Sequence, residues 1–312
     1  MIEGFARRLL LAASTNAWLR EHATRTAFVQ RSVSAFMPGE RLEDAMRAAS
    51  AEQARGVGTI LTKLGENVTR ADEAEQVAVH YLEALDRIAA AGLSAQISVK
   101  PTQLGLDVDA QLCFRHLERL VERAASCGNF VWIDMESSPY VDPTLTLFRR
   151  ARERSNRIGI ALQAYLRRTP TDLTALLPLG PAVRLVKGAY LEPALVAYPR
   201  KADVNEQFYR LACSMLGNRQ PAPGTLLHIA THDGALVERL GRFIAERGVS
   251  DSAYEYAMLY GIQRPLQQRV ATARRPLRVL VPYGDYWFPW YMRRLAERPA
   301  NVGFVVRNLF AR

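Results

Sequence analysis

Residues 130–187 contain three apolar runs, FVWIDM (130–135), GIALQAY (159–165) and VRLVK (183–187), separated by longer stretches of mixed polarity. Each run is almost continuously hydrophobic, as strands are when helices cover both faces of a parallel sheet. The runs also end near Asp134, Gln163 and Lys187, polar residues that core packing does not explain. This stretch therefore predicts consecutive strand–helix units of an α/β fold.

The same pattern extends in both directions from this stretch. Further strands are predicted at 58–63, 95–100, 226–232, 254–260 and 278–282, with helices such as 71–91, 109–126 and 235–247 between them. Eight units in succession predict a (βα)8 TIM-type barrel over residues 56–312, with residues 1–55 as an N-terminal helical segment packed on it. A doubly wound sheet is the alternative, weakened because no GxGxxG follows the first strand.

Charge and cysteine content bound the functional classes. The 312-residue chain carries a net charge of +10, which suits nucleic acid or an anionic membrane surface. Its arginines are scattered through the predicted helices without a basic tail, which argues against nucleic acid. No run approaches the roughly 18 apolar residues of a membrane span. Cys113, Cys127 and Cys213 show no CxxC spacing, so we expect a reducing, cytoplasmic compartment.

Polar residues gather where the predicted strands end. In (βα)8 barrels the chemistry lies at the carboxyl ends of the strands, and charged groups avoid burial unless they are paired. A structural ion pair is the alternative explanation for any single residue, but so many on one face predict a site. The residues placed there are Lys100, Asp134, Gln163, Arg184, Lys187, Thr231, His232, Glu255 and Tyr283.

Two adjacent arginines, Arg293 and Arg294, follow the aromatic residues Trp287, Trp290 and Tyr291. A planar guanidinium binds carboxylates and phosphates particularly well, so the pair is a candidate anion clamp. The competing interpretation is a solvated basic helix face.

Candidate residues exist for two other kinds of site, a Schiff-base lysine and a metal site. Lys187, one of only four lysines, could form a Schiff base as in a barrel aldolase. His228 and His232 lie four residues apart, but no third ligand is near them, so no metal site is predicted.

Eight motifs occur in register along most of the chain: ISVKPTQLG (97–105), WIDME (132–136), LQAYLRRT (162–169), RLVKGAY (184–190), IATHD (229–233), YEYAMLYG (254–261), VPYG (281–284) and RRLAERPAN (293–301). Together they resemble the proline dehydrogenases, and more narrowly the short monofunctional bacterial members. The resemblance implies a distorted barrel that holds non-covalent FAD, with the last helix over the barrel mouth. It implies oxidation of L-proline to 1-pyrroline-5-carboxylate by hydride transfer to flavin N5, in proline catabolism to glutamate.

The resemblance also implies roles for individual residues. Arg293 and Arg294 would clamp the substrate carboxylate with help from Lys100, and Glu297 would pair with Arg293. Asp134 would act beside the substrate nitrogen, Leu259 would pack on the substrate ring, and Arg184 would lie near flavin N5. The other flavin-binding residues would be Met135, Gln163, Val186, Lys187, Gly188, Ala189, Thr231 and His232. A quinone is the implied electron acceptor, so we expect peripheral contact with the inner face of the membrane.

Two positions depart from the family pattern. Leu280 and Trp290 stand where family tyrosines line the substrate ring. The alternative substrate is therefore a substituted or larger cyclic imino acid such as 4-hydroxyproline. The sequence leaves open the ring substrate, the physiological acceptor, the oligomeric state and any association with a separate pyrroline-carboxylate dehydrogenase.

Overall fold

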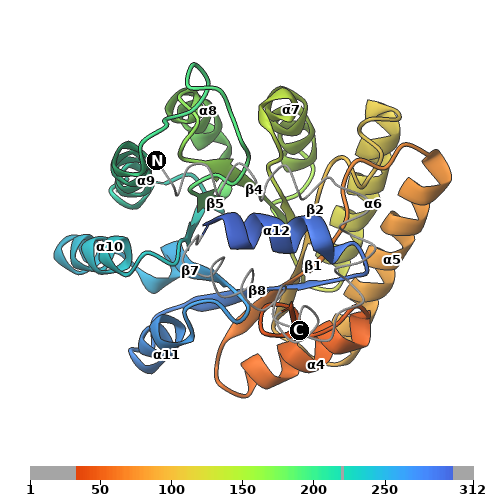
Figure 1. Cartoon of the computed structure of the whole chain (residues 1–312), viewed down its shortest axis with the longest axis horizontal. Helices are drawn as coiled ribbons and strands as arrows, with labels where there is room; N and C mark the ends of the chain where they lie inside the picture. The colour runs from red at the N-terminus through yellow and green to blue at the C-terminus, as the bar shows by residue number, and fades with distance from the viewer. Residues whose placement is uncertain (1–32, 219–220, 298–312) are drawn as a thin grey trace, which may run out of the picture.

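Eight parallel strands form a closed barrel in which every strand pairs with its neighbours in sequence order and β1 pairs with β8. The computed structural model describes residues 33–218 and 221–297, with side chains described as far as Met292. Figure 1 shows the helices as a ring around the strands. The predicted (βα)8 barrel is confirmed, and the doubly wound alternative is wrong because the sheet closes on itself.

The strands occupy the predicted apolar runs to within two residues at each end. Most end one or two residues before the predicted boundary, because the last residues of those runs already belong to the following loop. The strands are β1 (Gly58–Lys63), β2 (Ala95–Val99), β3 (Val131–Ile133), β4 (Ile158–Gln163), β5 (Ala182–Val186), β6 (Leu226–Ala230), β7 (Tyr254–Leu259) and β8 (Leu277–Tyr283).

The helices follow the amphipathic stretches, and two of them begin at an aspartate cap. Asp109 and Asp233 each accept a hydrogen bond from the main-chain N–H three residues later. Within the described ranges, no helix is both long and apolar enough to cross a membrane. The helices are α4 (Leu42–Gln53), α5 (Ala71–Ala90), α6 (Ala110–Ser126), α7 (Val141–Arg152), α8 (Thr169–Leu176), α9 (Lys201–Leu216), α10 (Gly234–Arg247), α11 (Arg264–Thr272) and α12 (Trp287–Glu297), with short 3-10 turns η1 (Ser138–Tyr140), η2 (Leu177–Leu179) and η3 (Asp251–Ala253).

The first and last described helices depart from the strand–helix alternation: α4 precedes β1 and takes a place in the ring against β1 and β8, whereas α12 follows β8 without joining the ring. Helix α4 buries Leu42, Ala45 and Ala49 in the main core. Helix α12 starts four residues after β8 and crosses the barrel at its centre in Figure 1, as expected of a helix over the mouth. Residues 1–32 of the expected N-terminal segment lie outside the described residues, so the division between residues 55 and 56 stays a prediction.

Among the described residues, side chains pack in a large hydrophobic cluster and in a smaller one. The larger one fills the space between the strands and the surrounding helices, and the smaller one contains Ile60, Trp132 and Ala182 inside the barrel. Trp132 reaches across Gly159 on the neighbouring strand, where an added Cβ atom would lie 2.5 Å from the indole. The indole also lies 4.1 Å, ring centre to ring centre, from His228 on β6. Glycine at position 159 therefore makes room for an aromatic floor inside the barrel.

A salt bridge closes the amino end of the barrel below this floor. Glu255 accepts two hydrogen bonds from Arg278, at 2.7 and 2.9 Å, and its Oε2 lies 2.9 Å from Nε2 of His228. Burial lowers the pKa of His228 to about 4, so its ring is neutral at pH 7. Glu255 is the second residue of β7, so its expected place at the carboxyl end was wrong.

Tyr283 is likewise not a site residue. It ends β8, but its hydroxyl lies 2.8 Å from Nε2 of His80 on α5, between the barrel and its outer helices. Successive side chains of a strand point to opposite faces, so the inward position nearest this end of β8 is Pro282.

We expect Glu255→Ala to lower the free energy of unfolding by about 3 kcal/mol, because it leaves the mostly buried Arg278 guanidinium without its carboxylate. Urea unfolding followed by circular dichroism measures the loss. The matched control is Glu206→Ala, which breaks a half-exposed pair with Arg239 and should cost less than about 1 kcal/mol. Equal losses in the two variants would contradict a supporting role for the lower salt bridge.

Candidate active site

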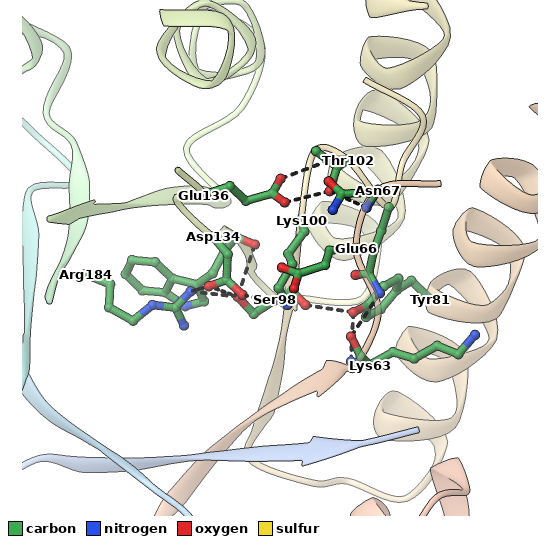
Figure 2. Close-up of polar contacts among 12 residues, drawn as sticks. Lys63, Glu66, Asn67, Tyr81, Ser98, Lys100, Thr102, Asp134, Glu136 and Arg184 are labelled. Atoms are coloured by element: carbon green, nitrogen blue, oxygen red, sulfur yellow. Dashed lines mark hydrogen bonds and ion pairs between the residues drawn. The ribbon is translucent and has the colours of Figure 1, made fainter. Parts of the chain in front are cut away.

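Three charged residues from different strands meet at the carboxyl end of the barrel (Figure 2). Lys100 follows β2, Asp134 follows β3, and Arg184 is the third residue of β5. The Lys100 Nζ lies 3.6 Å from Asp134 Oδ2, and the Arg184 Nη2 donates a hydrogen bond to Asp134 Oδ1. One carboxylate thus holds two cations, and all three residues were predicted as site residues.

Main-chain and hydroxyl contacts hold Asp134 in this position. Its N–H donates to the carbonyl of Val99 at 2.8 Å, which extends the pairing of β2 with β3 by one residue. The Ser98 hydroxyl donates to Asp134 Oδ1 at 3.0 Å and accepts from Arg184 Nη2 at 2.7 Å. Ser98 therefore links the carboxylate to the guanidinium across the barrel.

Arg184 is the most buried member of the network, with 3% of its surface exposed. Burial lowers the pKa of Arg184, and the charge of Asp134 opposes that shift. The guanidinium carbon lies 5.3 Å from the centre of the Trp132 ring, within the range of a cation–π contact. Its Nη1 is buried and has no hydrogen-bond partner in the described part of the chain. The site therefore presents a fixed donor that a bound acceptor atom can satisfy.

The strands β4 to β7 contribute a second group of polar contacts. Gln163 ends β4 and donates from Nε2 to the main-chain oxygen of Glu136 at 2.8 Å. His232, in the loop after β6, accepts through Nε2 from the Leu259 N–H at 2.8 Å. Thr231 is buried and accepts from the Asp233 N–H at 3.2 Å. These contacts orient side chains that sequence analysis assigned to cofactor binding.

Lys187 follows β5 and donates from Nζ to Asp233 Oδ2 at 2.9 Å. Burial lowers the pKa of Lys187, whereas the bond to Asp233 raises it. A Schiff-base lysine needs a neutral amine free to attack a carbonyl carbon. Although the pKa of Lys187 is lowered overall, its Nζ is hydrogen-bonded to Asp233, and this bond to a carboxylate disfavours the aldolase-like alternative.

The loop after β5 approaches β4 closely. Gly188 has φ +116°, and an added Cβ atom would lie 2.2 Å from the ring of Tyr165. Only glycine fits both the conformation and the contact. The main chain at Gly188 therefore lies directly against the Tyr165 ring.

The apolar residues predicted for the site come from three parts of the fold. Leu259 and Leu280 are register partners on β7 and β8, and Leu280 packs against the interior cluster that contains Ile60 and Trp132. Met135 is buried next to Asp134 in sequence, and Trp290 is buried on α12.

The predicted anion clamp lies on α12, which includes Arg293, Arg294 and Glu297. The side chains of these three residues lie outside the described part of the chain. Their predicted contacts with substrate and with each other stay predictions.

Sequence reasoning missed several residues that hold the predicted ones in place. Ser98 links Asp134 to Arg184, Asp233 holds Lys187, and Glu136 accepts two hydrogen bonds from Thr102. All of them lie within the motifs named above. Their closeness in sequence to a predicted site residue was the one feature that could have identified them as supporting residues.

The two histidines of β6 and its following loop have separate roles. His228 lies beside Glu255 at the lower end of the barrel, whereas His232 contacts Leu259 at the upper end. Among the described residues, no group of three His, Cys, Asp or Glu side chains is arranged to bind a metal.

The network of Lys100, Asp134 and Arg184, called the upper network below, can bind an anion and lower the pKa of a nearby amine. Lys100 and Arg184 carry more positive charge than Asp134 neutralises, and fixed cations stabilise a carboxylate that is brought between them. The same positive field would lower the pKa of any amine placed beside it.

Comparison with known proteins agrees with this geometry. The profile of the proline dehydrogenase family matches residues 45–307. The chain is 33% identical to a proline dehydrogenase of Deinococcus radiodurans, covering 99% of each chain. It is also 33% identical to proline dehydrogenase 1 of Bacillus subtilis strain 168, covering 97% of this chain and 98% of the relative.

Solved structures show the same fold. Proline utilization A (PutA) from Bdellovibrio bacteriovorus, inactivated by N-propargylglycine, superposes with a TM-score of 0.78 at 21% identity. The match covers 86% of this chain and 32% of that longer protein. By its sequence and its barrel, the chain belongs to the proline dehydrogenase family, whose members are flavin-dependent oxidoreductases.

Proposed function

We propose that this enzyme oxidises L-proline to the imine 1-pyrroline-5-carboxylate, with non-covalent FAD as the hydride acceptor at N5, in proline catabolism to glutamate. The observation that carries the proposal is the network of Lys100, Asp134 and Arg184 at the barrel mouth, in a chain of this family. Its residues provide fixed positive charge where a carboxylate and an amine must be held together.

The residues at the mouth fit a flavin. The buried Arg184 Nη1 offers a donor to a ring nitrogen or oxygen, and Lys187 offers positive charge to a diphosphate. Bound flavin supplies a two-electron acceptor, while the protein supplies orientation and electrostatics. The remaining residues proposed to hold it are Met135, Gln163, Val186, Gly188, Ala189, Thr231 and His232.

The substrate carboxylate is proposed to bind Lys100, Arg293 and Arg294. Anchoring it fixes the ring relative to the hydride acceptor, and such positioning is a large part of catalysis in two-reactant steps. Asp134 accepts bonds from Lys100 and Arg184 and is proposed to face the substrate nitrogen. Glu297, four residues after Arg293 on α12, is proposed to pair with it and help close the site.

The amine must be neutral to release hydride from the adjacent carbon. Lys100 and Arg184 favour the neutral amine because a nearby positive charge penalises the protonated form. These two residues thereby prepare the substrate as well as bind it.

The ring pocket is proposed to accept more than L-proline. Leu259 is proposed to pack on the ring, and Leu280 and Trp290 replace the tyrosines expected of the family. Leucine removes a hydroxyl and shortens the wall, whereas tryptophan adds apolar bulk. A site without a hydrogen-bonding hydroxyl discriminates weakly among apolar rings, by about 1–3 kcal/mol per methylene. A substituted or larger ring such as 4-hydroxyproline is the alternative substrate.

A quinone at the membrane surface is proposed as the electron acceptor. The net charge of +10 supports contact with anionic lipid, since each basic residue near the surface contributes up to about 1 kcal/mol. Peripheral contact of a cytoplasmic enzyme with the inner face of the membrane follows from this proposal.

We expect the purified protein to be yellow, and its visible flavin bands to disappear under anaerobic conditions when L-proline is added. A soluble quinone analogue should restore the bands, and NAD⁺ should not. A protein that is colourless and cannot be reconstituted with FAD would contradict the flavoenzyme proposal and favour the Schiff-base alternative. Restoration by NAD⁺ alone would contradict only the proposed acceptor.

Arg293→Met and Arg294→Met should each weaken binding of proline and of carboxylate inhibitors by about 2–4 kcal/mol, because each removes a charge-assisted hydrogen bond. Binding is measured by titration of the flavin spectrum. The matched control, Arg210→Met, changes a mostly exposed arginine of α9 and should leave affinity unchanged. Wild-type affinity in either α12 variant would show that the pair is a surface feature.

Leu280→Tyr, alone and combined with Trp290→Tyr, should shift preference towards L-proline, because it restores the hydroxyl and the bulk of the ring wall. The kcat/KM values for proline, 4-hydroxyproline and pipecolate measure the shift, which we expect to be at least about tenfold in ratio. Unchanged ratios would mean that these positions do not determine specificity and that plain proline oxidation is the better description.

A further inference from the structure

A buried carboxylate, that of Glu136, lies two residues beyond Asp134 and outside the network proposed to touch substrate. Only 2% of its surface is exposed. Its Oε2 accepts from the Thr102 main-chain N–H at 3.0 Å, and its Oε1 accepts from the Thr102 hydroxyl at 2.6 Å. Figure 2 shows both bonds running from Glu136 to Thr102, two residues after Lys100.

Thr102 in turn forms two hydrogen bonds with the β1–α5 loop. Its hydroxyl oxygen accepts from the Asn67 N–H at 3.0 Å, and its main-chain oxygen accepts from the Val68 N–H at 3.2 Å. Asn67 has φ +58°, a conformation uncommon for a residue other than glycine, which surrounding contacts must therefore maintain. The Oε2 of the preceding residue, Glu66, accepts from the Tyr190 hydroxyl at 3.5 Å.

We propose that Glu136 is a positioning residue for the reaction: its ionised carboxylate holds Thr102, and Thr102 in turn fixes the turn that carries Lys100 and the loop that carries Glu66. The inference rests on the proposed function, because it concerns the binding position of Lys100. Glu136 itself contacts neither substrate nor flavin in this proposal.

The hydrogen-bond directions favour the ionised form. Thr102 presents two donors, and a carboxylate accepts both of them, one on each oxygen. When the carboxyl group is protonated at Oε1, the Thr102 hydroxyl loses the acceptor for its proton while it still accepts from Asn67. Protonation therefore weakens the connection between Glu136 and the β1–α5 loop, because a charge-assisted bond is lost.

The surroundings of Glu136 place this change near neutral pH. Burial raises the pKa of Glu136 to about 7, while the two Thr102 bonds and Lys100 oppose the shift. The other titratable groups that face it are Glu66, which raises its pKa further, Cys113 on α6 and Tyr140 in η1. The carboxylate form, and with it the anchored loop, prevails above about pH 7 and is lost as the pH falls below that value.

Hydrogen exchange in the flavin-loaded enzyme tests the proposal without measuring activity. In the wild type, the Asn67 and Val68 amides should be about tenfold less protected at about pH 6 than at about pH 8.5, after correction for the intrinsic exchange rate. Glu136→Gln should show the low protection at both pH values, because its amide group places an acceptor oxygen at only one of the two positions that the Thr102 donors face. Thr102→Val should do the same for Asn67. The matched control is Glu122→Gln, an exposed carboxyl on α6, which should behave as wild type.

Binding of cyclopentanecarboxylate, a proline-shaped ligand without a nitrogen, provides the second measurement. Its Kd should rise about tenfold in the wild type between about pH 8.5 and about pH 6, and should be weak and independent of pH in Glu136→Gln. The positioning role is wrong if amide protection and ligand affinity in the wild type do not change with pH and Glu136→Gln keeps the same protection and affinity. This holds even if proline is oxidised. If proline neither bleaches the flavin nor competes with this ligand, the proposed function fails, while the exchange result still decides whether Glu136 anchors the loop.

Discussion

The guanidinium of Arg184, buried inside the barrel, is the constraint on which the site depends. Removing such a charge from water costs several kcal/mol unless a partner compensates for it. Here the compensation comes from Asp134 after β3, Ser98 on β2 and the Trp132 ring on β3. These partners reach Arg184 on β5 only while strands β2 to β5 are paired in the observed register. Pairing of these four strands and assembly of the upper network around Arg184 therefore depend on each other, and a strand that slips by one residue disrupts both.

The strands were predictable because their sequences carry a strong local signal. Near-continuous apolar runs such as residues 58–63 and 226–230 need burial on both faces, and eight of them in alternation with helices leave few architectures. The rule that barrel chemistry lies at the carboxyl ends then brought Lys100 and Asp134 together before any distance was known. The motif resemblance supplied the roles of α12, which composition and periodicity could not give.

The failures came from questions that local sequence does not answer. Glu255 begins its strand and belongs to the lower salt bridge, and Tyr283 ends its strand with its side chain facing the helices. Both residues were assigned to the carboxyl end of the barrel. For Glu255 the error was its position at the start of the strand, and for Tyr283 it was the side of the sheet to which its side chain points. Glu136 and Asp233 were missed because their partners, Thr102 and Lys187, lie more than thirty residues away and meet them only in the folded chain.

The indole of Trp132 has a consequence for how this barrel can change over evolutionary time. It lies between two ionic assemblies, with the Glu255–Arg278 pair and His228 on one side and Arg184 with its partners on the other. Because the aromatic layer keeps the two assemblies from sharing hydrogen bonds, substitutions at the mouth need not disturb the lower pair that braces the strands. Substitutions at positions such as Leu280 can therefore change which ring substrate binds while the Glu255–Arg278 salt bridge stays intact. Gly159 makes this separation possible, because it leaves space for the indole between the two assemblies.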